Sequence, residues 1–185
     1  MRRILLLIVL ACLGGFQALM AQADILPRST NSATMVGLGG YNLMDSYLSP
    51  GSTSRNYTGM GFSVLHERMK RIALGGGRIS RQQLISAELA RTENAAATAT
   101  DLAGFASYAL GYHYHLPSLL PGLRLLAGGQ AHGLLGFIYN TRNGNNPATT
   151  KADADLRLSA MVLYTLRIKQ YPVRLRYQVA MPFAG

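Results

Sequence analysis

Residues 112–126 read YHYHLPSLLPGLRLL, with apolar or aromatic side chains at alternate positions on both sides of a Pro-rich turn. Successive side chains of a β-strand point to opposite faces, so this spacing predicts two strands joined by a short turn. The positions in between carry His113, His115 and Arg124. Each strand of this predicted hairpin therefore has one uncharged face and one ionisable face.

The same alternation continues well beyond the hairpin, in the second half of the chain. It extends over segments 102–116, 123–139, 154–168 and 173–183, each with one face free of charged residues. Strands of soluble proteins average about five or six residues, whereas a strand that crosses a bilayer needs about 9 to 11. The length of the patterns therefore favours membrane-spanning strands, with lipid on the uncharged face and a polar lumen on the other.

Tyrosines near the ends of these strands support the same interpretation. Tyr112 and Tyr114 lie near one end of the pattern and Tyr139 near the other. Tyrosine is enriched at both membrane interfaces, so we expect these side chains in two aromatic girdles. A soluble antiparallel barrel or sandwich, with the uncharged face as its core, is the alternative that period 2 alone leaves open.

The predicted fold class is all-β, an antiparallel up-and-down β-barrel of the transmembrane type. A fainter alternation in the first half adds three strands to the four above, and the short Pro- or Gly-rich turns all fall at one end. The long polar loops 42–56 and 140–151 fall at the other end, which we expect to be extracellular. Seven strands are predicted, at 33–41, 57–70, 79–93, 102–116, 123–139, 154–168 and 173–183. Because bacterial barrels have an even number of strands, we expect domain 24–185 to be incomplete at its C-terminus.

The N-terminal segment is predicted to be a signal peptide. Residues 1–23 contain two arginines, an apolar run and the small-x-small sequence Ala21-Gln22-Ala23, the pattern that signal peptidase cleaves. Export to the outer membrane is the predicted destination. A periplasmic protein, or a lipoprotein modified at Cys12, is the alternative.

Composition narrows the possible partners. The 185 residues are 49% hydrophobic and 14% charged, which predicts a folded domain rather than disorder. The net charge of +10 suits an acidic partner, but an exported chain has no access to nucleic acid. Outer-membrane lipid, and a possible extracellular ligand at the loops, are therefore the expected partners.

Polar residues of the ionisable face are the candidate binding residues of the lumen. Three of them, His113, His115 and His132, have spacings that a metal site can use, but barrel linings also carry histidines in polar networks, which we consider the better explanation. Likewise Glu67 and Glu88 are expected to neutralise arginines across the lumen. We predict no metal, no cofactor and no catalytic residues. The candidates are His66, Glu67, Arg68, Glu88, His113, His115, Arg124, His132, Arg157, Arg174 and Arg176.

Three functions remain open on this basis. The favoured one is a non-enzymatic outer-membrane barrel, acting as a structural or surface-interaction element or as a small pore. A hydrolase with active-site groups at the barrel rim, including His66, Glu67 and Glu88, is the second. A soluble periplasmic lipid-binding barrel is the third.

Part of the sequence resembles a known family. Residues 37–69 contain the stretches Tyr47–Pro50, Tyr57–Gly59 and Glu67–Met69, and residues 173–185 read VRLRYQVAMPFAG. These stretches resemble an uncharacterised Bacteroidetes family of signal-peptide-bearing, outer-membrane-barrel-like proteins, a domain of unknown function. The resemblance implies no activity, and members of that family continue past the position of Gly185.

Overall fold

The computed structural model describes residues 30–44, 56–118 and 120–185, and it confirms the all-β prediction. Within these residues there are seven strands and no helix. None of the described residues forms a helix that could cross a membrane. The strands are β1 (Thr30–Met44), β2 (Asn56–Ile72), β3 (Ile79–Asn94), β4 (Thr100–His115), β5 (Leu123–Asn140), β6 (Ala148–Ile168) and β7 (Tyr171–Ala184).

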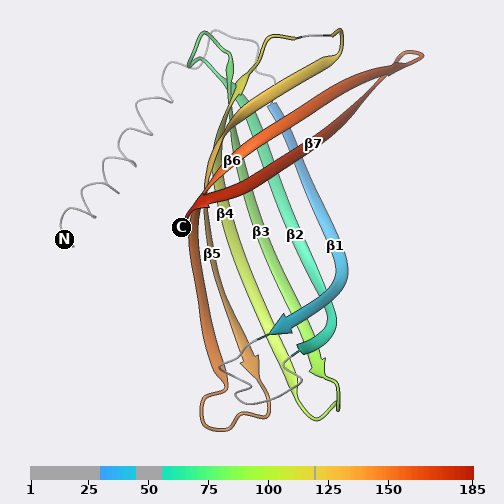
Figure 1. Cartoon of the computed structure of the whole chain (residues 1–185). Helices are drawn as coiled ribbons and strands as arrows, with labels where there is room; N and C mark the ends of the chain where they lie inside the picture. Colours follow the sequence, from blue (N-terminus) through green and yellow to red (C-terminus); the bar gives the residue numbers. More distant parts are fainter. Residues whose placement is uncertain (1–29, 45–55, 119) are drawn as a thin grey trace, which may run out of the picture.

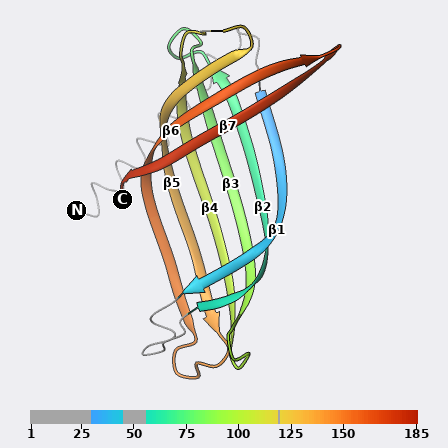
Figure 2. The ribbon, with the colours of Figure 1, turned by 45° about the vertical axis from the view of Figure 1, so that its right-hand side comes forward.

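The strands form one antiparallel sheet in the order of the chain, from β1 to β7. The sheet curls into a half-barrel with a convex and a concave face, as Figures 1 and 2 show. The connections β2–β3, β4–β5 and β6–β7 gather at one end, which we call the turn end. The connections β3–β4 and β5–β6 lie at the opposite end, the loop end, where β1 also ends and β2 begins.

Alternation along the strands separates the two faces, as predicted for the second half of the chain. In β4, Leu102, Tyr108 and Tyr112 lie exposed on the convex face, while Asp101 and His113 are buried on the concave face. The strand register carries this parity across the sheet, since paired residues share a face. As a result, the convex face of β4 to β7 consists of uncharged residues throughout.

Two connections differ from the predicted bounds or fall outside the description. Pairing of β6 with β5 begins at Ala148 rather than at the predicted residue 154, which reduces the loop to residues 141–147. Thr149 and Lys151 continue the ladder although polar residues occupy both faces there, so hydrophobic alternation could not mark this part of the strand. Most of the predicted loop 42–56 lies outside the described residues, as does the predicted signal peptide 1–23.

The β6–β7 hairpin crosses over the concave face of the other strands (Figures 1 and 2). In this hairpin β7 pairs with the part of β6 from Leu156 to Ile168, with a register shift between Leu156 and Arg157. Although β7 is an edge strand in the sheet order, its side chains reach those of β2 and β3. The crossing brings polar residues of β7 into contact with polar residues of β2 and β3.

The concave face holds two small apolar clusters and a larger set of buried polar residues. Ala90, Ala103 and Ile138 form one cluster near the loop end, and Met69, Leu126 and Met161 form the other near the turn end. The buried polar residues of the described chain are Glu67, Ser80, Gln82, Thr92, Asp101, His113, Gln130, Asn140 and Ser159. The interior is therefore polar and apolar in about equal parts, whereas the convex face of β4 to β7 is uncharged.

Candidate functional site

A network of buried amide side chains links five strands across the turn half of the concave face. Gln82 of β3 donates from Nε2 to Glu67 Oε1 of β2 at 2.7 Å, and accepts from Gln130 Nε2 of β5 at 2.7 Å. Gln178 of β7 exchanges two hydrogen bonds with Gln82, at 2.9 and 3.1 Å, and donates to Ser159 of β6 at 2.9 Å. We call these five residues the glutamine cluster. Four of its residues are buried, Gln82 fully so, and Gln178 is half-buried.

An ion pair and a histidine extend the glutamine cluster. Arg176 of β7 lies 2.5 Å from Glu67 Oε1, with the Glu67 side chain 7% exposed. The Nε2 atom of His113 lies 2.9 Å from Ser159 Oγ. The Glu67 carboxylate and the Nε2 atom of His113 thus find partners on strands that are distant in the sequence, as buried polar groups require, while the buried Nδ1 atom of His113 has no hydrogen-bond partner among the described residues.

Two glycines make these contacts possible. Gly111 of β4 stands in the register between Gln82 and Gln130, and a Cβ there would lie 2.6 Å from Gln130 Cγ. Gly128 of β5 stands between His113 and Ser159 in the same way. Because glycine has no side chain, the residues on the two strands that flank it can reach across it and form a hydrogen bond with each other.

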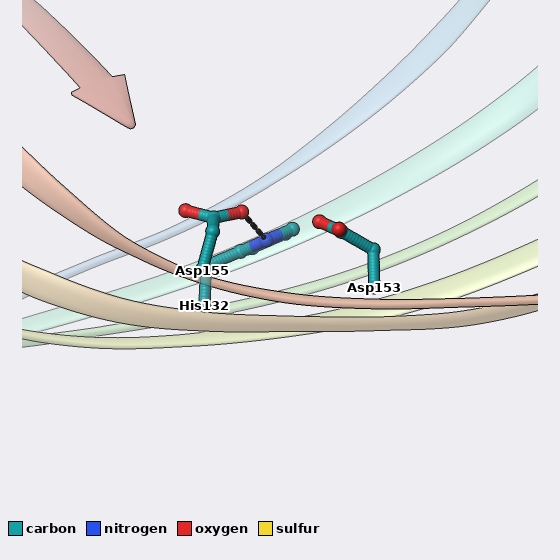
Figure 3. Close-up of side chains that lie close together, drawn as sticks. All are labelled: His132, Asp153 and Asp155. Carbon is teal, nitrogen blue, oxygen red and sulfur yellow. Dashed lines mark hydrogen bonds and ion pairs between the residues drawn. The ribbon is translucent and has the colours of Figure 1, made fainter. Parts of the chain in front are cut away.

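A second cluster lies closer to the loop end, where His132 of β5 pairs with Asp155 of β6 (Figure 3). His132 Nδ1 is 2.9 Å from Asp155 Oδ2, and both side chains are nearly buried. Arg157 binds the same carboxylate through Nε at 2.5 Å and Nη2 at 2.8 Å, and its Nη2 also lies 2.7 Å from His132 Nδ1. The exposed Asp153 points toward His132 in Figure 3 without an ion pair or hydrogen bond to it.

His132, Asp153 and Asp155 resemble a metal-binding group, because their ligand atoms lie within 4.8 Å of one another. The position is nevertheless filled by a cation of the protein itself, since Arg157 neutralises Asp155 through a bidentate pair. An added metal ion would have to displace this guanidinium. The geometry therefore favours an ion-pair network here.

A third group of polar side chains closes the loop end of the concave face. Asn140 donates from Nδ2 to Asp101 Oδ1 at 2.7 Å and to the Tyr57 hydroxyl at 3.1 Å. Tyr41 donates its hydroxyl to Glu88 Oε2 at 2.9 Å. Glu88 is thus bound by a tyrosine rather than by the arginine that the sequence led us to expect, whereas the expected arginine is present at Glu67.

Nine of the eleven predicted residues lie on the concave face, and two do not. His66 and Arg68 point to the convex face, where His66 Nδ1 lies 2.9 Å from Thr34 Oγ1. Their orientation toward the lumen was therefore predicted wrongly, because the mixed sequence of β2 does not show which parity is buried. The nine on the concave face are Glu67, Glu88, His113, His115, Arg124, His132, Arg157, Arg174 and Arg176.

The three histidines on the concave face do not converge. His113 bonds to Ser159, His115 Nε2 lies 2.7 Å from Ser80 Oγ, and His132 belongs to the pair with Asp155. The proposed hydrolase group is also separated, since His66 and Glu67 are neighbours on opposite faces of β2. Sequence reasoning did not single out Gln82, Gln130 and Gln178 as a group, although each stands at a concave-face position in its strand.

Comparison with known families gives one match for this chain. The family model described as "Protein of unknown function (DUF3316)" matches residues 4–185. The chain belongs to the DUF3316 family. Searches of the curated proteins and of the solved structures each gave no match. The predicted kinship with a domain of unknown function is thereby confirmed, and the family brings no assigned activity with it.

Proposed function

We propose that this DUF3316 protein is a non-enzymatic outer-membrane β-barrel protein that acts as a structural or surface-interaction element. Residues 1–23 direct its export, the convex face contacts lipid, and the loops at the loop end contact the outside. Specificity in this proposal lies in the connection β1–β2 and in loop 141–147, which replaces the predicted 140–151. Its interior serves to hold the barrel together.

The inverted distribution of polar and apolar side chains carries the proposal. On the convex face Leu158 is 55% exposed, Leu175 54% and Phe183 59%, whereas Gln82 and His113 are fully buried. Water-soluble proteins bury large apolar side chains and expose polar ones, so this arrangement suits a hydrocarbon solvent. The soluble alternative placed the uncharged face in the core, and the convex position of that face argues against it.

The height of the uncharged band also suits a bilayer. Tyr139 pairs with Leu102, and Tyr112 lies ten residues further along β4. Ten residues span roughly 33 Å along a strand, which a tilt of about 40° reduces to about 25 Å, the usual height of the apolar band of such barrels. The tyrosines then lie at the two membrane interfaces, where their amphipathic rings are favoured.

The glutamine cluster favours a surface element over an open pore. It extends across the concave face from β2 to β7, and Gln82 and Gln130 within it are buried. Small barrels fill their interior with side chains in this way. A lumen obstructed by a satisfied hydrogen-bond network offers little space for solute, which leaves the loop end as the surface for recognition.

Spin labels on adjacent residues of β7 test the membrane assignment. The chain, with Cys12 replaced by Ser, would be reconstituted in phospholipid vesicles with one cysteine, at Val179 on the convex face or at Ala180 on the concave face. We expect the label at Val179 to be relaxed strongly by lipid-dissolved oxygen. The label at Ala180 should respond less to oxygen and more to a water-soluble nickel complex.

Cell fractionation and gel mobility complete the test. The proposal predicts recovery with the outer membrane and a folded band whose mobility changes on boiling. Recovery in the soluble periplasmic fraction, without a heat-dependent change in mobility, would contradict it. Equal oxygen accessibility at Val179 and Ala180 would do the same.

A further inference from the structure

The charges of the described residues are divided unequally between the two ends of the half-barrel. At the turn end, Glu67 is the only carboxylate among the described residues, and Arg176 already neutralises it. The other described carboxylates are nearer the loop end of their strands, at Glu88, Glu93, Asp101, Asp153 and Asp155. Among the described residues, cations therefore outnumber carboxylates at the turn end.

Part of this charge lies on the face that the proposed function assigns to lipid. Arg68 and Lys70 of β2 and Arg81 of β3 point to the convex face at the turn end, and we call them the outer cation patch. Arg68 is exposed, and Lys70 and Arg81 are partly exposed. Charged residues are expensive on a lipid-facing surface except near the interfaces, so their position at one end of the strands is significant.

The register brings two cations of the outer cation patch together. Lys70 pairs directly with Arg81, which places their Cβ atoms about 5 Å apart on one face. Arg68 is two residues from Lys70 on the same face and therefore adjoins the pair diagonally. Like charges in directly opposed positions destabilise a sheet. A phosphate group between them would convert this repulsion into charge-assisted hydrogen bonds.

Tyrosines fix the depth of the outer cation patch. Tyr112 of β4 pairs with Arg81, and Tyr114 follows on the same face, where its hydroxyl accepts a hydrogen bond from Arg78 Nη1 at 3.3 Å. This hydrogen bond raises the pKa of the Arg78 guanidinium in the β2–β3 turn. Interfacial tyrosines lie at the level of lipid headgroups, so Arg81 and Lys70, which stand in register with Tyr112, lie at the level of the phosphates.

We infer that the outer cation patch binds the phosphate headgroup of an anionic lipid in the leaflet at the turn end. This inference rests on the proposed function, because it requires the convex face to contact lipid. Arg68, Lys70 and Arg81 hold the headgroup, and the tyrosines of β4 border it. The site gives the barrel a preference for anionic over zwitterionic lipid at one leaflet.

Lipid selectivity in reconstituted vesicles tests the inference. The whole chain would be inserted in phosphatidylcholine vesicles, and its association with spin-labelled phosphatidylglycerol and phosphatidylcholine would be compared by electron paramagnetic resonance. Each cation near the surface contributes about fivefold in affinity for an anionic surface. We expect a preference of at least about fivefold for phosphatidylglycerol, which collapses near 1 M salt, where the screening length is about 3 Å.

Two triple variants separate a headgroup site from a general effect of net charge. In the first, Arg68→Gln, Lys70→Gln and Arg81→Gln are combined, and the preference should fall to about that of phosphatidylcholine. In the matched control, Arg71→Gln, Arg124→Gln and Arg174→Gln remove the same charge from the concave face at the same end. The control should retain the preference of the unmodified chain.

The outcomes distinguish this inference from the proposed function. A chain that inserts, with heat-dependent gel mobility, but shows equal association with both lipids overturns the headgroup site alone. An equal loss of preference in the two triple variants also overturns it, since the effect would then follow net charge. Failure of the unmodified chain to insert into vesicles of either composition overturns the headgroup site and the membrane assignment together.

Discussion

Single residues on the concave face depend on partners that are far away in the sequence. Glu67 of β2 is held by Gln82 of β3 and by Arg176 of β7, and no apolar neighbour could replace either contact. Removing one member of a buried ion pair leaves the other charge without a partner, and this usually costs more than the pair itself contributes. Glu67 therefore has a structural role that its place in the chain does not reveal.

The substitution Glu67→Gln should lower the free energy of unfolding by about 3 kcal/mol, because Arg176 then remains largely buried without a carboxylate. Equilibrium unfolding in urea, followed by gel mobility of the folded band in lipid, measures the change. Glu93→Gln is the control. Glu93 pairs with Arg91 on exposed side chains, 46% and 69% exposed, so we expect a change of less than about 1 kcal/mol. Similar losses for both variants would show that the Glu67 pair is not effectively buried.

The face that a residue occupies could be predicted in strands where charged and uncharged residues alternate without exception. Arg124, Arg157 and Arg174 were assigned correctly to the concave face because uncharged residues flank each of them. His66 and Arg68 were not, since β2 alternates Leu65, Glu67 and Met69 with three basic or ionisable residues. Only pairing with β3 shows that Glu67 and Met69 are the buried set.

At the scale of strands, glycine positions determine which side chains meet. Gly128 and Gly129 are neighbours in β5, but they face opposite sides of the sheet. A Cβ on Gly128 would lie 1.9 Å from the carbonyl oxygen of Tyr112, whereas a Cβ on Gly129 would lie 3.4 Å from that of Arg157. The first position cannot accept a side chain without movement of backbone, and the second can.

We therefore predict that Gly128→Ala lowers the free energy of unfolding by about 2 kcal/mol, as overpacking commonly does. The His113–Ser159 hydrogen bond above Gly128 should be lost at the same time. Gly129→Ala should change stability by about 0.5 kcal/mol or less. Both variants would be compared by urea unfolding in lipid vesicles. If Gly129→Ala proved the more harmful substitution, the assigned faces of β5 would be reversed.

Strand existence was predictable from period 2, but strand ends and curvature were not. The predicted segments for β5 and β7 differ from the observed strands by at most two residues at each end. The start of β6 was placed six residues late, because Ala148 to Asp153 carry no apolar alternation. The contact of β7 with β2 and β3 was not predictable, since it arises from the curl of the whole sheet rather than from any local pattern.

For the molecule as a whole, the most important contacts are those that tie the β6–β7 hairpin to the first strands. They consist of the Gln82–Gln178 pair and the ion pair between Glu67 and Arg176. The β5–β6 ladder and the packing of Met161 on Met69 and Leu126 also hold the hairpin, but the polar side chains are what tie β7 to β2 and β3. We therefore expect the glutamine cluster to help hold β7 over the concave face.

Gln178→Ala should loosen the β6–β7 hairpin without unfolding the rest of the sheet. The variant loses the two side-chain hydrogen bonds to Gln82 and the one to Ser159. Amide hydrogen exchange in β7 should therefore rise by about tenfold, while β4 and β5 keep their protection. Hydrogen exchange with mass spectrometry in vesicles measures this. Gln83→Ala is the control, because Gln83 bonds to Tyr108 on the convex face. Unchanged exchange in β7 after Gln178→Ala would contradict a structural role for the cluster.

Loop 141–147, between β5 and β6, is held at its base by hydrogen bonds of Asn140. The backbone of Asn140 donates to Pro147 O at 2.7 Å, and its side-chain oxygen accepts from the amides of Arg142 and Asn143. Gly144, at the tip, has open space around it. Because Asn140 secures the base of the loop, the tip is free to acquire inserted or substituted sequence while the strands stay as they are. Natural or engineered variants can therefore differ in sequence at this exposed tip while the strands that carry it stay the same.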